Sequence, residues 1–196
     1  MQTYKSFIHK YISLNIIEWT LFSSKHKVSH HKKGEILHHA GDIFTHLRFI
    51  NYGIARAYII DEKGKDHTWS IYFNDENAQM TNLFLVDYHS FIHQCAADIH
   101  IEILEDCELL TIGYDDVHFL YKNLKKWERF GRMMSESAYT YTHNYIVDRM
   151  TKNATQRFQE FMRDTPYLMD KVPQYHIATL LSITPQSLSR LKKRLT

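Results

Sequence analysis

The residues with the clearest chemical purpose lie at the end of the chain. Gln186, Ser187 and Arg190 fall within about one turn of a predicted helix that begins at Thr184 and Pro185. Amide and guanidinium side chains form paired hydrogen bonds with the edges of adenine and guanine, so these three residues are predicted to read DNA bases. Backbone phosphates are expected to meet the hydroxyl of Thr184, at the positive end of the helix, and the basic residues Lys192, Lys193 and Arg194.

A helix-turn-helix over residues 171–196 is the element that would position these side chains. Its first helix is predicted to open at Pro173 and to turn an apolar face inward, formed by Ile177, Ala178, Leu180 and Leu181. Thr184 is a suitable N-cap for the second helix, whose inward residues are Leu188, Leu191 and Leu195. Ser182 stands where the turn commonly carries a glycine, and a plain helical hairpin is the alternative interpretation.

The charge balance supports a nucleic-acid partner at this end. Residues 151–196 carry eight Lys or Arg and three Asp or Glu, whereas residues 1–150 carry sixteen and nineteen. The overall charge of +2 therefore hides a basic C-terminal segment and a mildly acidic remainder. Neutralisation of phosphates supplies much of DNA affinity, although a solvated helix would also be basic.

Histidines offer a different chemistry, because the chain has 14 of them. Histidines from neighbouring strands of a jelly roll can converge on one metal ion, which makes a metal-dependent, cupin-like enzyme an alternative function. No His-x-His with a following Glu ligand stands at cupin spacing, and adjacent strand residues point to opposite faces. We therefore expect scattered histidines, no metal site, and no catalytic residue.

Length and composition limit the other possibilities. The chain has 196 residues, and its two cysteines can supply neither a disulfide framework nor four iron–sulfur ligands. The first residues lack the apolar core of a signal peptide, and no segment approaches the ~20 apolar residues of a membrane span. We expect a cytoplasmic protein without a membrane partner.

The remaining chain divides into three styles. Residues 4–24 suggest an amphipathic helical start, and four glycines then separate short strand-like runs at intervals of seven, twelve and eleven residues. Such spacing is typical of an all-β barrel or jelly roll, and residues 61–64 are a predicted hairpin turn. A long helix follows over 127–150, with one stripe predicted to form a two-fold dimer interface: Phe130, Met134, Ser137, Tyr141 and Tyr145. A short helix over 155–163 leads into the helix-turn-helix.

Four segments in order resemble the Crp/Fnr family of bacterial transcription regulators: residues 33–42, 47–65, 103–112 and 172–195. The sequence of the last segment, residues 172–195, is similar to that of the family branch common in Bacteroidetes. The resemblance implies an α+β fold with an effector-type β-roll (1–126), a dimerisation helix (127–150) and a DNA-binding helix-turn-helix (151–196). It also implies a homodimer with double-stranded DNA as partner, and RNA polymerase as a further candidate partner. Because the sequence ends two residues after Arg194, we expect no full β-hairpin wing.

The cyclic-nucleotide cassette of the family is missing from this chain. Family members that bind cyclic AMP use a Gly-Glu pair and an Arg-Ser pair, but no glycine lies between Gly64 and Gly113 here. The Arg-Ser position falls on Ala97 and Asp98, so a carboxylate replaces the guanidinium that would hold the phosphate. We expect no cyclic AMP binding. The roll could hold an apolar or aromatic ligand, bind nothing, or serve as a dimer scaffold, and a degenerate member acting through protein contacts is a further alternative.

Overall fold

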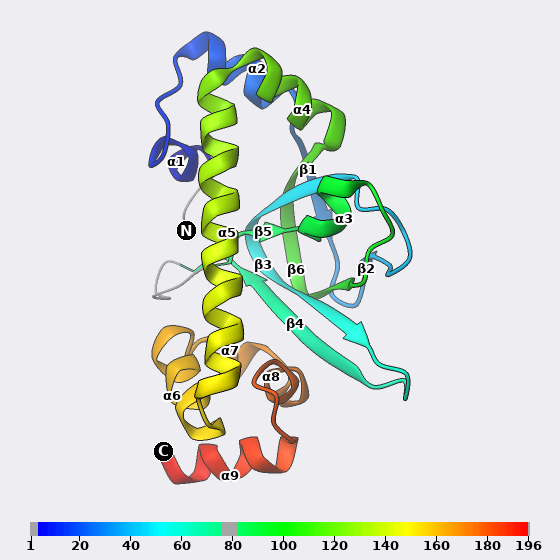
Figure 1. The fold of residues 1–196 in the computed structure, drawn as a ribbon, viewed down its shortest axis with the longest axis vertical. Helices are drawn as coiled ribbons and strands as arrows, with labels where there is room; N and C mark the ends of the chain where they lie inside the picture. The colour runs from blue at the N-terminus through cyan, green and yellow to red at the C-terminus, as the bar shows by residue number, and fades with distance from the viewer. Residues whose placement is uncertain (1–3, 76–81, 196) are drawn as a thin grey trace.

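The computed structural model describes residues 4–75 and 82–195, apart from the side chain of Leu195, whose predicted inward packing lies outside the described part. Figure 1 shows one long helix running the length of the molecule, with the sheet on one side and the C-terminal helices at one end. The order is helices, sheet, long helix and helices, which is the predicted α+β architecture.

The N-terminal segment forms two helices where a single helical start is expected: α1 (Tyr4–His9) and α2 (Ile16–Ser24). The chain breaks between them because Asn15 caps α2. Its side chain accepts the Glu18 N–H at 2.9 Å, and its own N–H donates to the Glu18 carboxylate at 2.8 Å. This reciprocal capping box fixes the start of α2.

Six antiparallel strands form the roll: β1 (Lys27–His31), β2 (Ile36–His38), β3 (His46–Ile60), β4 (Asp66–Phe73), β5 (Phe84–Leu85) and β6 (His100–Gly113). The strand order across the sheet is β1-β6-β3-β4, and in addition β2 pairs with β6 and β5 pairs with β3. The strand-like runs predicted on either side of Gly53 join into the single strand β3, because its pairing with β6 continues through register shifts near this glycine. Gly53 has φ +97°, and a Cβ there would lie 2.4 Å from the Asp106 carbonyl oxygen. Only glycine fits this bulge.

The predicted hairpin turn between β3 and β4 is confirmed. The Asp61 N–H donates to the Lys65 carbonyl oxygen at 2.9 Å, and the Asp61 carboxylate accepts the N–H groups of Lys63 and Lys65. A short helix, α3 (Tyr88–His93), lies between β5 and β6 and was not expected from the sequence.

After the roll, α4 (Tyr114–Asn123) leads into the long helix α5 (Lys125–Thr151), which was predicted over 127–150. The stripe expected to meet a second chain is divided: Phe130 and Met134 pack on the roll of the same chain, whereas Ser137 and Tyr141 are exposed and their partner contacts stay a prediction. Phe130 is 3% exposed and belongs to the roll's hydrophobic core, so the predicted partner contact is wrong at this residue. Met134 also packs against that core.

The C-terminal helices are α6 (Ala154–Asp164), α7 (Leu168–Lys171), α8 (Gln174–Leu180) and α9 (Pro185–Leu195). They form a second hydrophobic core with Phe158, Ile177 and Leu188, which also includes Ile54 and Ile71 of the roll. The C-terminal segment therefore packs on the sheet as well as on itself, and the division at residues 126 and 150 stays a prediction. None of the helices in the described ranges is long and apolar enough to cross a bilayer.

Candidate nucleic-acid interface

The predicted helix-turn-helix consists of α8 and α9. Pro173 was predicted as the first helical residue of α8. Its ψ of 134° is extended, so it is the N-cap of this helix instead. Thr184 precedes α9, and its hydroxyl oxygen accepts the Ser187 N–H at 3.1 Å. The predicted N-cap is therefore confirmed, and it fixes the direction in which α9 leaves the turn.

The turn between the two helices depends on Ser182. This residue has φ +53°, in the left-handed region that favours glycine. The Ile183 N–H donates to the Ala178 carbonyl oxygen at 2.9 Å, and the Ser182 N–H donates to Thr179 at 3.0 Å. These two hydrogen bonds form a Schellman-type end to α8. Ser182 thus adopts the left-handed conformation for which this turn commonly carries a glycine.

One face of α9 is fixed in the second core. Leu188 is fully buried and Leu191 packs against the same cluster, which includes Phe158, Ile177 and Leu181. Because residues on the opposite side of an α-helix point away from such a contact, the remaining side chains are held in a defined orientation at the surface.

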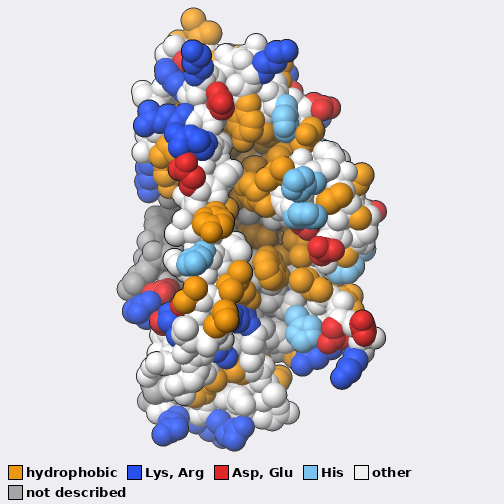
Figure 2. All heavy atoms as spheres, viewed as in Figure 1, with side chains coloured by type: hydrophobic (Ala, Val, Ile, Leu, Met, Phe, Trp, Pro, Cys, Tyr) orange, Lys and Arg blue, Asp and Glu red, His pale blue; other side chains and the backbone are white. Residues whose placement is uncertain are grey.

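The outer face of α9 carries most of the predicted DNA contacts. Gln186, Arg190, Lys193 and Arg194 are exposed, whereas Ser187 and Lys192 are half-buried. Figure 2 shows Lys and Arg side chains on the end of the molecule where Figure 1 places α9. Gln186 and Arg190 lie one helical turn apart, and Lys193 follows Arg190 at the next turn.

Three of the predicted DNA-contact side chains, Thr184, Ser187 and Arg190, form hydrogen bonds with one another. The Thr184 hydroxyl donates to the Ser187 Oγ at 3.0 Å, and an Arg190 guanidinium N–H donates to the same oxygen at 3.3 Å. A phosphate would need the Thr184 hydroxyl proton, which is directed at Ser187 here. Gln186 and Arg190 thus form a more direct candidate reading pair than Ser187.

A buried ion-pair network on the roll positions α8. Arg56, on β3, is 4% exposed and donates to the Asp66 carboxylate at 2.6 Å and to Glu102 at 2.9 Å. Burial alone would raise the pKa of the Asp66 carboxyl, but the Arg56 guanidinium holds it below its ordinary value. Beside this network, the Thr179 hydroxyl of α8 donates to the Thr68 hydroxyl at 2.9 Å.

Two further arginines hold the C-terminal end of α8. Arg149, near the end of α5, donates to the Leu180 carbonyl oxygen and to the Tyr145 hydroxyl. Arg157, on α6, donates to the Leu181 carbonyl oxygen at 3.1 Å. The last carbonyls of a helix lack intrahelical partners, so these guanidinium groups satisfy them and connect the long helix to the helix-turn-helix.

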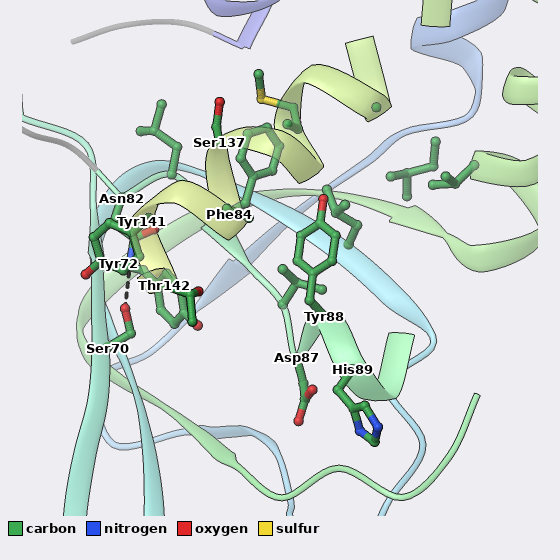
Figure 3. A pocket seen from close by; sticks show the side chains of 18 of the residues that line it. Ser70, Tyr72, Asn82, Phe84, Asp87, Tyr88, His89, Ser137, Tyr141 and Thr142 are labelled. Atoms are coloured by element: carbon green, nitrogen blue, oxygen red, sulfur yellow. Dashed lines mark hydrogen bonds between the residues drawn. The ribbon is translucent and has the colours of Figure 1, made fainter. Parts of the chain in front are cut away.

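A cavity of about 720 Å³ lies between α5 and the roll, and the predicted dimer stripe of α5 lines it. Asp98, the carboxylate expected at the Arg-Ser position, also lines the cavity. Asp87 lines it too, and Figure 3 shows its carboxylate. No Lys or Arg is among the described residues that line this cavity. Burial raises the pKa of Tyr121 to about 12, and burial likewise raises the pKa of Tyr88 and Tyr141, so these hydroxyls are neutral donors.

Comparison with known proteins gives a match in structure only. No protein-family profile and no curated protein sequence matches the chain. FixK2 from Bradyrhizobium japonicum superposes with a TM-score of 0.71 at 12% identity, over 87% of this chain and 84% of that one. A Crp/Fnr-family transcriptional regulator from Eubacterium rectale superposes at 0.70 with 20% identity, over 94% and 87%. The c-di-GMP-responsive regulator CLP from Xanthomonas campestris superposes at 0.64 with 14% identity, over 92% and 91%. The chain has the Crp/Fnr fold.

The Crp/Fnr fold confirms the architecture that the four sequence segments implied, and the plain helical hairpin is wrong. The Bacteroidetes branch stays a prediction. The metal-dependent alternative finds no support, because no three His, Cys, Asp or Glu side chains within residues 4–75 and 82–195 gather as metal ligands.

Sequence reasoning missed Arg149 and Arg157, which hold the end of α8, and Arg56, whose ion pairs with Asp66 and Glu102 lie beside that helix. Arg56 carries a readable signal, since it stands between Ala55 and Ala57 in an apolar strand. A charged residue at such a position is almost always paired with an opposite charge. Arg149 and Arg157 give no such signal, because their acceptors are backbone carbonyls distant in sequence.

Proposed function

We propose that the chain is a sequence-specific, DNA-binding transcription regulator of the Crp/Fnr type. The observation that carries this proposal is the two-sided character of α9. Its inner face is fixed in a core by Leu188, while Gln186, Arg190 and Lys193 project from the outer face. A rigid helix with exposed amide and guanidinium groups is what reading of a major groove requires. RNA polymerase remains a candidate partner.

The proposed assembly is a homodimer that joins along α5 on the side away from the roll. The apolar side chains exposed there follow a spacing of seven and four residues: Tyr139 (73% exposed), Ile146 (51%) and Met150 (81%). This pattern is typical of a two-helix seam. A seam of this kind replaces the interface predicted on the opposite stripe, which faces the cavity.

Selection from random duplexes tests the DNA proposal. The purified chain is expected to enrich an inverted repeat with half-sites about 10 base pairs apart, because two recognition helices of a two-fold dimer enter major grooves ~34 Å apart. The affinity is expected to fall steeply with salt. Failure to enrich any sequence above the starting pool would contradict sequence-specific binding.

Light scattering tests the dimer. The chain is expected to be a dimer at micromolar concentration, and Ile146→Asp is expected to convert it to a monomer by burying a charge in the seam. Ile43→Asp, at a similarly exposed isoleucine on the roll, is the matched control and should stay dimeric. A monomeric unmodified chain would remove the homodimer from the proposal.

The regulator is proposed not to respond to cyclic AMP. Support comes from the cavity, whose described lining includes Asp87, Asp98 and His89 but no Lys or Arg that could hold a phosphate. A missing charge-assisted, bidentate contact costs on the order of a few kcal/mol. Calorimetric titration that showed low-micromolar cyclic AMP affinity would contradict this.

A further inference from the structure

The end of the molecule opposite α9 carries a second basic surface. Residues 1–17 and 117–135 together carry seven Lys or Arg and one Glu, whereas the rest of residues 1–150 carries nine and eighteen. Figure 2 shows Lys and Arg side chains gathered at the end where Figure 1 places α2 and the start of α5. Such segregation within an otherwise acidic part of the chain is typical of a surface that attracts an acidic partner.

Two ion pairs bring three helices together at this end. Lys126 of α5 contacts the Glu18 carboxylate of α2 at 2.8 Å, and Lys25 of α2 contacts the Asp116 carboxylate of α4 at 2.9 Å. The start of α2 therefore lies beside the junction of α4 and α5. We call the surface that these elements form the basic end, and define it by five exposed residues: Ile16, Ile17, Lys122, Lys125 and Arg129.

The three cations of the basic end are not used by the fold. Within residues 4–75 and 82–195, no carboxylate forms an ion pair with Lys122, Lys125 or Arg129. Their neighbour Arg132 differs, because it contacts the Glu136 carboxylate one turn along α5 at 2.6 Å. An exposed cation without an internal partner can pair with a carboxylate of another molecule, and the guanidinium of Arg129 can do so through two hydrogen bonds.

Two adjacent isoleucines give the basic end an apolar component. Ile16 and Ile17, in the first turn of α2, are 82% and 77% exposed. The other large apolar side chains of this helix, Trp19, Leu21 and Phe22, belong to the core of the roll or pack against it. An apolar centre with a charged rim is typical of a protein–protein interface. The isoleucines thus favour a protein partner over a purely electrostatic one.

A nucleic acid and a bilayer fit the basic end less well. Single strands stack their bases on aromatic rings, but both partly exposed rings near the basic end are covered by lysines. The Lys5 Nζ lies 5.0 Å from the centroid of the Trp19 ring, and the Lys25 Nζ lies 4.7 Å from that of Phe119. A helix that binds a bilayer buries an apolar face along its length, whereas α2 exposes only the isoleucine pair of its first turn.

We propose that the basic end binds an acidic protein segment that also carries apolar side chains. Lys122, Lys125 and Arg129 pair with its carboxylates, and Ile16 and Ile17 contact its apolar residues. Figure 1 places α9 at the other end of the molecule, so a duplex and this partner can be bound at the same time. The proposal goes beyond DNA binding and does not depend on it, since the basic end contains no residue of α9.

Selection from a phage-displayed library of random peptides tests the proposal, with peptides of about 16 residues, enough for four helical turns. Without DNA, the full chain is expected to enrich peptides that combine Asp or Glu with Leu, Ile or Phe. Lys125→Glu with Arg129→Glu should weaken these peptides at least about tenfold at ~0.15 M salt. Lys63→Glu with Lys65→Glu, at exposed lysines of the β3–β4 turn, makes the same change in net charge and should have little effect. Equal affinity of the enriched peptides for the two double variants would overturn the proposal.

The apolar contact has its own test. Ile17→Ser is expected to weaken the enriched peptides at least about fivefold, because it removes apolar surface that the partner covers. Ile60→Ser, at an isoleucine of β3 that is 48% exposed, is the matched control and should leave the affinity unchanged. Unchanged affinity in Ile17→Ser would contradict the apolar part of the proposal.

Two further probes distinguish the other partners. Vesicles of phosphatidylcholine and phosphatidylglycerol, and a random DNA duplex, should bind the Lys125→Glu, Arg129→Glu variant as they bind the control with Lys63→Glu and Lys65→Glu. A selective loss of vesicle or duplex binding in the first variant would assign the basic end to a bilayer or a nucleic acid and overturn the proposal. Circular dichroism verifies folding, and Lys125→Gln with Arg129→Gln replaces a charge-reversed variant that does not fold.

Discussion

The outer face of α9 and the cavity beside α5 differ in charge and burial. The α9 face carries exposed Gln186 and Arg190 over a basic helix end. The cavity is lined by aromatic rings and neutral hydroxyls, together with Asp87, Asp98 and His89. A polyanion is therefore attracted to the α9 face, whereas the described cavity lining offers it two carboxylates and no Lys or Arg.

The arginines of the molecule repeat this difference. Arg56, Arg149 and Arg157 donate to carboxylates or backbone carbonyls inside the protein, so their charge serves the fold. Arg190 donates only to the Ser187 hydroxyl among the hydrogen bonds described for it, which leaves most of its fork for a partner. The location of an arginine's acceptors, more than its presence in a basic segment, separates the structural guanidinium groups from the candidate reading group.

The largest expected effect comes from detaching α9 from its core. Leu188→Ala removes a fully buried side chain and is expected to lower the free energy of unfolding of the C-terminal helices by about 2–5 kcal/mol. Urea unfolding followed by circular dichroism measures this. DNA binding should fall with it. Ser189→Ala, on the exposed neighbour, is the control and should change stability little. Unchanged stability and unchanged DNA affinity in Leu188→Ala would show that the orientation of α9 does not depend on this core.

Acid is expected to weaken the roll through His26. Burial lowers the pKa of His26 to about 4, while its Nδ1 meets the Phe22 carbonyl oxygen and its Nε2 meets the Tyr4 hydroxyl. The unfolded chain binds this proton near pH 6.5, so stability is full above that pH and is lost as the pH falls toward 4. The expected loss from pH 7 to pH 5 is about 2 kcal/mol.

Urea unfolding at both pH values checks the role of His26. His26→Phe should flatten this dependence, and His39→Gln at an exposed histidine should not. His176, beside the Arg56 network, has a pKa lowered by burial and then by Arg56, and it leaves a residual slope of the same sign. An unchanged slope in His26→Phe would contradict the assignment.

Of the two basic residues compared here, Arg190 is expected to read a DNA base, and Lys193 is expected to contact only phosphate. Arg190→Ala should cost about 1–3 kcal/mol on the selected operator and relax the preference at one base pair per half-site. Lys193→Ala should instead weaken operator and random DNA by similar factors and flatten the salt dependence. Anisotropy titrations of both duplexes measure the two effects. If Arg190→Ala weakened both duplexes equally, Arg190 would be a phosphate contact.

Local sequence patterns predicted the C-terminal helix-turn-helix well because its controls are local, and the DNA contacts on it stay predictions. Thr184 caps α9 by accepting the N–H of Ser187, three residues along the chain, and Ser182 closes a turn within five residues. Gly53 marked a break in the strand pattern, but its role as a bulge within one continuous β3 depends on pairing with β6. Short-range spacing thus located the elements, whereas pairing decided where they join.

The orientation of α5 could not be predicted for the same reason. Phe130 and Tyr141 lie on one apolar stripe, which any helix can turn toward a partner chain or toward its own sheet. The structure packs Phe130 into the core of the roll, whereas Tyr141 is 46% exposed and lines the cavity. Amphipathicity identifies a buried face but not the surface that buries it.

The cap of α9 gives a smaller effect that links stability to the reading face. Thr184→Val removes the oxygen that accepts the Ser187 N–H and is expected to cost about 1 kcal/mol of stability. Thermal unfolding of the variant and of Thr184→Ser, which keeps the hydroxyl, measures it. A cost as large in Thr184→Ser as in Thr184→Val would mean that the methyl group, and not the cap, stabilises the turn.

The smallest expected effect is a gain at the turn between α8 and α9. Ser182 adopts φ +53°, which costs a non-glycine residue about 1–2 kcal/mol, while glycine loses roughly 0.5–1 kcal/mol more chain entropy on folding. Ser182→Gly is therefore expected to raise stability by about 0–1.5 kcal/mol, the difference of these opposing terms. Ser189→Gly, the same change within α9, should lower stability by roughly 0.5 kcal/mol because glycine is the poorer helix former. Thermal unfolding of the two variants should thus move in opposite directions. Loss of stability in both would show that the strain at Ser182 is smaller than the chain entropy that glycine loses on folding, because the backbone hydrogen bond from residue 182 to Thr179 is kept in the variant.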